Sequence, residues 1–186
     1  MKNLLIIFSI LLPLIAIPVF SFSQTNETTL KTVFIERFTR FVEWPAETFD
    51  DKEDSADFFA LGIYGNSPLL PEIRDLYSRQ TIKGKKVKIL EFNHPNKITD
   101  CHALFISKCD DATLKKILIH LDNKPILTIS DTDGFAQKGV HINMFKENNM
   151  IRFEINADAV QNDGLEVSYM LLKLAKIVKL KEKCRL

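Results

Sequence analysis

The sequence predicts a single α/β domain, a sandwich in which helices flank a mixed, partly parallel sheet. Three observations lead to this fold class. Apolar runs of strand length alternate with amphipathic stretches in the middle of the chain, residues 140–156 alternate between apolar and polar side chains, and apolar residues near the C-terminus recur at helical spacing. The domain is therefore expected to end in a β-hairpin and a helix.

Residues 1–23 have the features of a secretory signal peptide. One basic residue precedes an apolar run over residues 4–20, and Ser-Phe-Ser places small residues at positions −3 and −1 of a cleavage site before Gln24. The run is also long enough for an uncleaved membrane anchor, but two prolines interrupt it, so cleavage is the preferred interpretation. The predicted organisation is a leader followed by one domain over residues 24–186.

Removal of the leader leaves 163 of the 186 residues, enough for one domain with a substantial core. It also removes one of the 25 basic residues, so that 24 basic residues are balanced by 24 acidic ones. A neutral chain gives no electrostatic reason to expect nucleic acid or an anionic membrane as a partner.

The first predicted element is an amphipathic helix over residues 30–44, which Pro45 ends because it disfavours a helical Trp44. Trp44 itself has two interpretations, a core residue at the helix end or an anchor for a partner, and the core is favoured. A polar, acidic surface loop follows at residues 47–57, and then a buried strand at residues 58–64.

Strands and helices then alternate, and this predicts parallel, Rossmann-like pairing in the middle part. The expected elements are a helix at 68–77, strands at 87–92 and 102–107, a helix at 110–121 and a strand at 126–129.

The hairpin is predicted from two alternating segments, residues 140–145 and 151–156, joined by Glu147-Asn148-Asn149. Period-2 alternation indicates one buried, apolar face and one exposed, polar face. A helical turn at 157–162 and a final helix through Val178 complete the domain.

No catalytic, cofactor-binding or metal site is predicted. Gly62-x-x-Gly65 is too short for a phosphate loop, and the Asp131-x-Asp133-Gly134 sequence lacks the distal acidic ligand of a calcium loop. No Ser, His and Asp occur in a nucleophile-elbow context. The chain is not expected to be an enzyme.

The three cysteines, Cys101, Cys109 and Cys184, allow at most one disulfide. Cys101 and Cys109 flank a predicted strand, which would hold them about 25 Å apart, whereas bridged Cα atoms lie within about 7 Å. A bridge between Cys101 and Cys109 would need a shorter strand, and Cys184 could reach either, so the pairing stays open.

Several segments, taken together and in this order, resemble the YfiR-like family of secreted bacterial proteins. The resemblance covers about residues 30–178 and is carried by FTRFVEWPAETF, FFALGIYGNSPL, TIKGKKVKI, CHALFIS, LTISDTDGFA…G…IN and LEVSYMLLKLAKIV.

The resemblance implies a periplasmic regulator. In the YfiR system a soluble protein binds the periplasmic domain of an inner-membrane diguanylate cyclase and restrains it, until an outer-membrane lipoprotein draws it away and cyclic-di-GMP synthesis and biofilm formation follow. Other relatives are sensory modules of membrane kinases. The alternative function is therefore a small-molecule sensor acting with a kinase, with its pocket at the switch point of the sheet. A homodimer is a further option.

The family also suggests where this chain differs. Relatives often have a cysteine at the position of Gly62, paired with the position of Cys101, and this chain lacks that partner. The preferred partner surface is the hairpin with the loop 157–165, because it combines polar positions expected to be exposed with a nearby apolar strand. The residues expected to contact a partner are Glu154, Asn156, Asp158, Asp163 and Leu165.

Overall fold

The computed structural model describes residues 21–49 and 58–180. The predicted leader lies almost wholly outside the described residues, as do Cys184 and most of the predicted acidic loop. Within the described part, no helix is both long and apolar enough to cross a bilayer.

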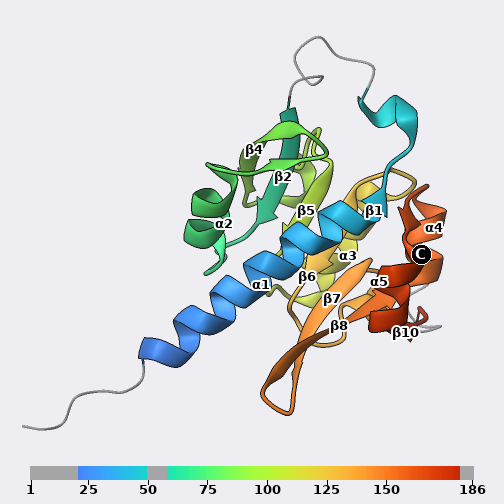
Figure 1. Ribbon diagram of the computed structural model, residues 1–186. Helices are drawn as coiled ribbons and strands as arrows, with labels where there is room; N and C mark the ends of the chain where they lie inside the picture. Colours follow the sequence, from blue (N-terminus) through green and yellow to red (C-terminus); the bar gives the residue numbers. More distant parts are fainter. Residues whose placement is uncertain (1–20, 50–57, 181–186) are drawn as a thin grey trace, which may run out of the picture.

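An eight-stranded sheet forms the centre of the domain (Figure 1), with the strand order β10-β8-β7-β6-β5-β2-β4-β3. The strands that pair in parallel through the middle are β4 (Lys85–Phe92), β2 (Phe58–Tyr64), β5 (Ala103–Ile106), β6 (Leu127–Ser130) and β7 (Ile142–Glu147). Towards the edges, β3 (Thr81–Ile82) and β8 (Met150–Asn156) pair antiparallel with their neighbours, and β10 (Lys176–Val178) pairs in parallel with β8. The predicted α/β class with a mixed sheet is confirmed.

Helices cover both faces of this sheet. One face packs against α1 (Ser21–Phe41), α2 (Leu70–Tyr77) and α5 (Tyr169–Leu174), and the other face packs against α3 (Asp111–Leu121). In Figure 1, α1 runs diagonally across the front of the sheet and α3 lies behind it. The remaining short elements are β1 (Val42–Glu43), β9 (Glu166–Val167), α4 (Ala157–Asn162) and three single turns at Ala46–Phe49, Pro95–Lys97 and Ala136–Lys138.

The central strands are buried on both faces, which explains why they are continuous apolar runs. In β2, Phe59, Leu61 and Ile63 belong to the core on the α1 side. Ala60 and Tyr64 alternate with them and belong to the core on the α3 side. Two separate cores therefore hold the sheet between its helical layers.

The predicted hairpin is present as β7 and β8. Its register pairs Ile142 with Ile155 and Glu147 with Met150, and the two-residue turn consists of Asn148 and Asn149. Both turn residues have positive φ, 49° and 61°. A turn of this kind matches the twist of the strands, and asparagine tolerates its left-handed backbone better than most residues.

The first predicted helix is too long at its C-terminal end. α1 ends at Phe41, and Val42 and Glu43 pair antiparallel with Val167 and Glu166. These residues leave the helix because their backbone groups form a ladder with β9, a partner that lies more than 120 residues away in the sequence.

The final predicted helix is also too long. Ser168 caps α5, since its Oγ accepts a hydrogen bond from Leu171 N at 3.3 Å, and the helix ends at Leu174. The next residues form the edge strand β10, because β8 offers a free row of backbone groups for pairing. After the hairpin, the described residues therefore form the short helices α4 and α5, with β9 between them, and the added strand β10.

Candidate interaction surface

Three of the five predicted contact residues are buried. Glu154 is 4% exposed, Asn156 0% and Leu165 2%. The predicted exposure of Glu154 and Asn156 is wrong, because the turn Ala136–Lys138 packs on their face of the hairpin. Gln137 Nε2 donates to Glu154 Oε2 at 2.9 Å, and Asn156 Nδ2 donates to Ala136 O at 2.8 Å. These side chains hold the loop onto the sheet.

Of the other two predicted residues, Asp163 is half-buried and has a structural role. His141 is buried, and its Nδ1 accepts a hydrogen bond from Thr128 N at 3.1 Å. The ring proton therefore lies on Nε2, which faces Asp163 Oδ2 at 2.9 Å. Asp163 Oδ1 also accepts from Asn123 N at 3.1 Å. Asp163 thus joins the end of α4 to β7 and to the end of α3, whereas Asp158 is exposed.

Replacing Asp163 by alanine is expected to lower the free energy of unfolding by about 1–3 kcal/mol, because the buried His141 N–H loses its acceptor. Urea unfolding measures this change. Asn162→Ala is the control, since Asn162 is exposed in the same helix and its loss should change stability by no more than about 0.5 kcal/mol. Equal stability of the two variants would contradict the assigned role.

A second buried histidine lies in an aromatic cluster at the start of β2. His102 Nδ1 accepts from Ala60 N at 2.9 Å, and its ring lies 5.0 Å from the rings of Phe49 and Phe59. Trp44 Nε1 donates to His102 O at 2.9 Å, and Trp44 is 8% exposed. Trp44 is therefore a core residue, as the favoured interpretation of the sequence proposed.

The stability of the protein is expected to fall between pH 7.5 and 5.5, and less so in a His102→Gln variant. Burial, with a contribution from Lys85, lowers the pKa of His102 in the folded state. The unfolded chain, with an ordinary pKa near 6.5, then takes up a proton first, so acidification favours unfolding. Urea unfolding at the two pH values measures the difference. An identical pH dependence in both proteins would contradict this assignment.

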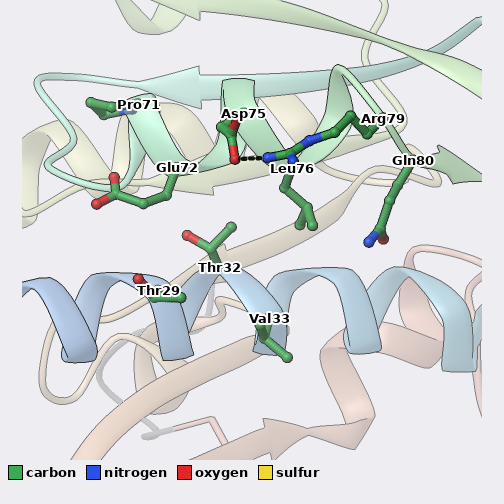
Figure 2. A pocket seen from close by; sticks show the side chains of 9 residues that line it. All are labelled: Thr29, Thr32, Val33, Pro71, Glu72, Asp75, Leu76, Arg79 and Gln80. Atoms are coloured by element: carbon green, nitrogen blue, oxygen red, sulfur yellow. Dashed lines mark hydrogen bonds and ion pairs between the residues drawn. The ribbon is translucent and has the colours of Figure 1, made fainter.

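Two hollows lie over the described surface away from the hairpin. The first is a groove of about 610 Å³ between α1 and α2 (Figure 2), in which Thr32 of α1 points towards Glu72 and Leu76 of α2. Glu72 Oε1 accepts from Thr28 Oγ1 at 3.1 Å, which ties the two helices together.

The second hollow, of about 540 Å³, lies where β2, β5 and β6 end, and we call it the strand-end hollow. It is lined by Asn66, Pro68, Phe105, Ser107, Lys108, Asp131, Thr132 and Asp133.

The largest cluster of exposed apolar side chains lies on α5 and β10, and we call it the C-terminal patch. It consists of Tyr169, Met170, Leu174 and Ile177, each 50–75% exposed. In α5, Leu171 points inward and is 5% exposed, whereas the first three patch residues are exposed to solvent. Soluble proteins seldom expose neighbouring large apolar residues unless the surface contacts another molecule.

A lysine lies beside the C-terminal patch, and a hollow lies next to α5. Lys173 Nζ lies 4.5 Å from the centre of the Tyr169 ring. A hollow of about 490 Å³ between α4, β9 and α5 is lined in part by Leu165 and Leu172. The patch therefore combines apolar contact area with positive charge.

Comparison with known protein families identifies a match. Residues 28–176, well over half of the chain, match the family described as YfiR/HmsC-like. The chain belongs to the YfiR/HmsC-like family. No curated protein matches it significantly. The matched range includes the whole sheet except the last two residues of β10.

Members of the YfiR/HmsC-like family are periplasmic regulators of membrane signalling proteins rather than catalysts. In this member, the described residues hold no group of three or more His, Cys, Asp or Glu side chains arranged for a metal ion.

The two cysteines in the described residues form no disulfide. Cys101 is buried and Cys109 is half-buried, and both are free. Burial raises the pKa of Cys101 to about 12, so its thiol is not reactive near neutral pH. A Cβ atom built on Gly62 would lie 3.4 Å from Cys101 Sγ. A cysteine at position 62 would therefore place its side chain next to Cys101.

Proposed function

We propose that this protein is a periplasmic, repressor-type regulator that binds the outer domain of an inner-membrane signalling enzyme, a diguanylate cyclase, and restrains its activity. The C-terminal patch of a YfiR/HmsC-like chain is the observation that carries this proposal. Family membership supplies the class of partner, and the patch supplies a surface that could bind it.

The chemistry of the patch supports one kind of occupant. Large side chains such as Tyr169 and Met170 provide contact area of the type found at the centres of protein interfaces. Lys173 is exposed beside it, with its Nζ 4.5 Å from the centre of the Tyr169 ring. The complementary surface is an apolar patch with an acidic rim, and attraction between the two would speed their encounter.

The proposal also includes export of the chain. A leader over residues 1–23, cut before Gln24, would deliver the domain to the compartment in which its family acts. Intact-mass measurement of the protein recovered from the periplasm tests this directly. A mature chain beginning at Gln24 is expected, and a chain that keeps Met1 would contradict cleavage.

In-cell cross-linking tests the partner. A tagged chain, produced at its native level, is cross-linked in the envelope and purified, and the attached proteins are identified by mass spectrometry. Recovery of an inner-membrane diguanylate cyclase is expected. Recovery of a membrane kinase instead would replace the cyclase as partner, and recovery of the tagged chain alone would contradict the proposal.

A further inference from the structure

The strand-end hollow lies at a point where the chain changes direction across the sheet. From β2 the chain passes through α2, on one face, to β4; from β5 it passes through α3, on the opposite face, to β6. The segments that follow β2 and β5 therefore diverge at the carboxyl ends of adjacent parallel strands. In open α/β sheets, ligands bind in the crevice that such divergence creates.

A buried polar group without a partner lies in this crevice. Ser107 is 6% exposed, and its Oγ forms no hydrogen bond with any described residue. Its backbone is fixed, because Ser107 N donates to Tyr64 O at 3.0 Å. Gly65 lies directly beside it, with φ +79°, and a Cβ there would lie 3.5 Å from Ser107 Cβ. Buried hydroxyls are normally satisfied, so this one calls for an external partner.

The positive and negative charges around the strand-end hollow offset one another. Asp131 Oδ2 is held by Lys31 Nζ at 2.8 Å, and the exposed Lys108 and Asp133 carry opposite charges on the rim. Asp110 already occupies the start of α3, where its Oδ1 accepts from Thr113 N at 2.9 Å. The hollow therefore offers neither net charge nor a free helix N-terminus to an anion.

The remaining polar side chains of the strand-end hollow are suited to binding the hydroxyl groups of a ligand. Asn66, Ser107 and Thr132 carry side chains that can both donate and accept hydrogen bonds, as a hydroxyl does. Phe105 is 1% exposed, so no aromatic face is available for stacking a base. We propose that the strand-end hollow binds an uncharged, polyhydroxylated small molecule of monosaccharide size. Its volume of about 540 Å³ is in the range of small-molecule sites.

Isothermal titration calorimetry of the mature chain tests the proposal. The uncharged probes are D-glucose, D-galactose, D-ribose and D-mannitol, and the charged probes are glycine, inorganic phosphate and putrescine. Saturable binding is expected for at least one uncharged probe and for no charged probe. Saturable binding of any charged probe, or of none of the seven, overturns the proposal.

Single-residue variants test whether the probe binds in the strand-end hollow. Asn66→Ala and Ser107→Val are expected to weaken binding of the uncharged probe at least tenfold, because each removes a polar group that lines the hollow. Asn66 is exposed, so its replacement leaves the fold intact even if Ser107→Val does not fold. Gln80→Ala, in the groove between α1 and α2, is the matched control and should bind as the unaltered chain does. Unchanged affinity in Asn66→Ala and in folded Ser107→Val would overturn the assignment.

Discussion

Replacing Leu174 by aspartate is expected to abolish capture of the membrane partner in the cross-linking experiment. Leu174 is 75% exposed in the C-terminal patch, so a charge there would remain unpaired and desolvated once a partner covers it. The loss of binding free energy at such a position is at least about 2 kcal/mol, or roughly thirtyfold in affinity. The measurement is the yield of partner relative to the tagged chain.

The control for this variant is Ile119→Asp. Ile119 is 53% exposed near the C-terminal end of α3, on the opposite face of the sheet, so it introduces the same charge in a similar helical setting. Both variants should unfold within about 0.5 kcal/mol of the unaltered protein, because both sites are exposed. If Ile119→Asp lost the partner while Leu174→Asp kept it, the interaction surface would lie on the α3 side instead.

Replacing Gly62 by cysteine is expected to create a disulfide with Cys101. The Cβ position at Gly62 lies 3.4 Å from Cys101 Sγ, close enough for a bridge after small adjustments. Closing the loop between residues 62 and 101 should make the oxidised variant about 2–4 kcal/mol more stable than its reduced form. Urea unfolding with and without a reductant gives this difference, and thiol counting reports the bridge.

The Gly62→Ala variant measures how much a side chain at position 62 lowers stability through steric contact alone. Its Cβ would lie 2.7 Å from Leu104 Cδ1 and 2.9 Å from Phe92 Cε2, so both side chains must shift and the variant should be less stable than the unaltered protein. The reduced Gly62→Cys variant should have about the same stability as Gly62→Ala. A Gly62→Cys protein that keeps both thiols free under oxidising conditions would contradict the proposed geometry.

Local sequence patterns predicted much of the sheet and α3. Strands β2, β5 and β6 were predictable because strands buried on both faces need continuous apolar runs. The hairpin was predictable because alternation and the Asn148-Asn149 turn are both local signals. The edge strand β10 could not be predicted, because Ile177 and Val178 fit the period of a helix equally well. Only pairing with the free edge of β8 makes this segment a strand.

The candidate surface was harder to predict than the fold. Alternation indicates that Glu154 and Asn156 lie on the face opposite Ile155, but it does not reveal that the turn Ala136–Lys138 covers that face. Met170 and Leu174 fit the buried side of a long helix, yet the helix is too short to bury them. Both errors arise from packing between segments distant in sequence, which local patterns do not encode.

The most direct test of the central claim is the cellular level of cyclic-di-GMP. Deleting the gene for this chain is expected to raise that level, because the cyclase is released, and returning the unaltered gene should lower it again. Returning the Leu174→Asp variant at the same protein level should leave it raised. An unchanged cyclic-di-GMP level after deletion, in cells that contain the cross-linked cyclase, would contradict the claim that this protein restrains that enzyme.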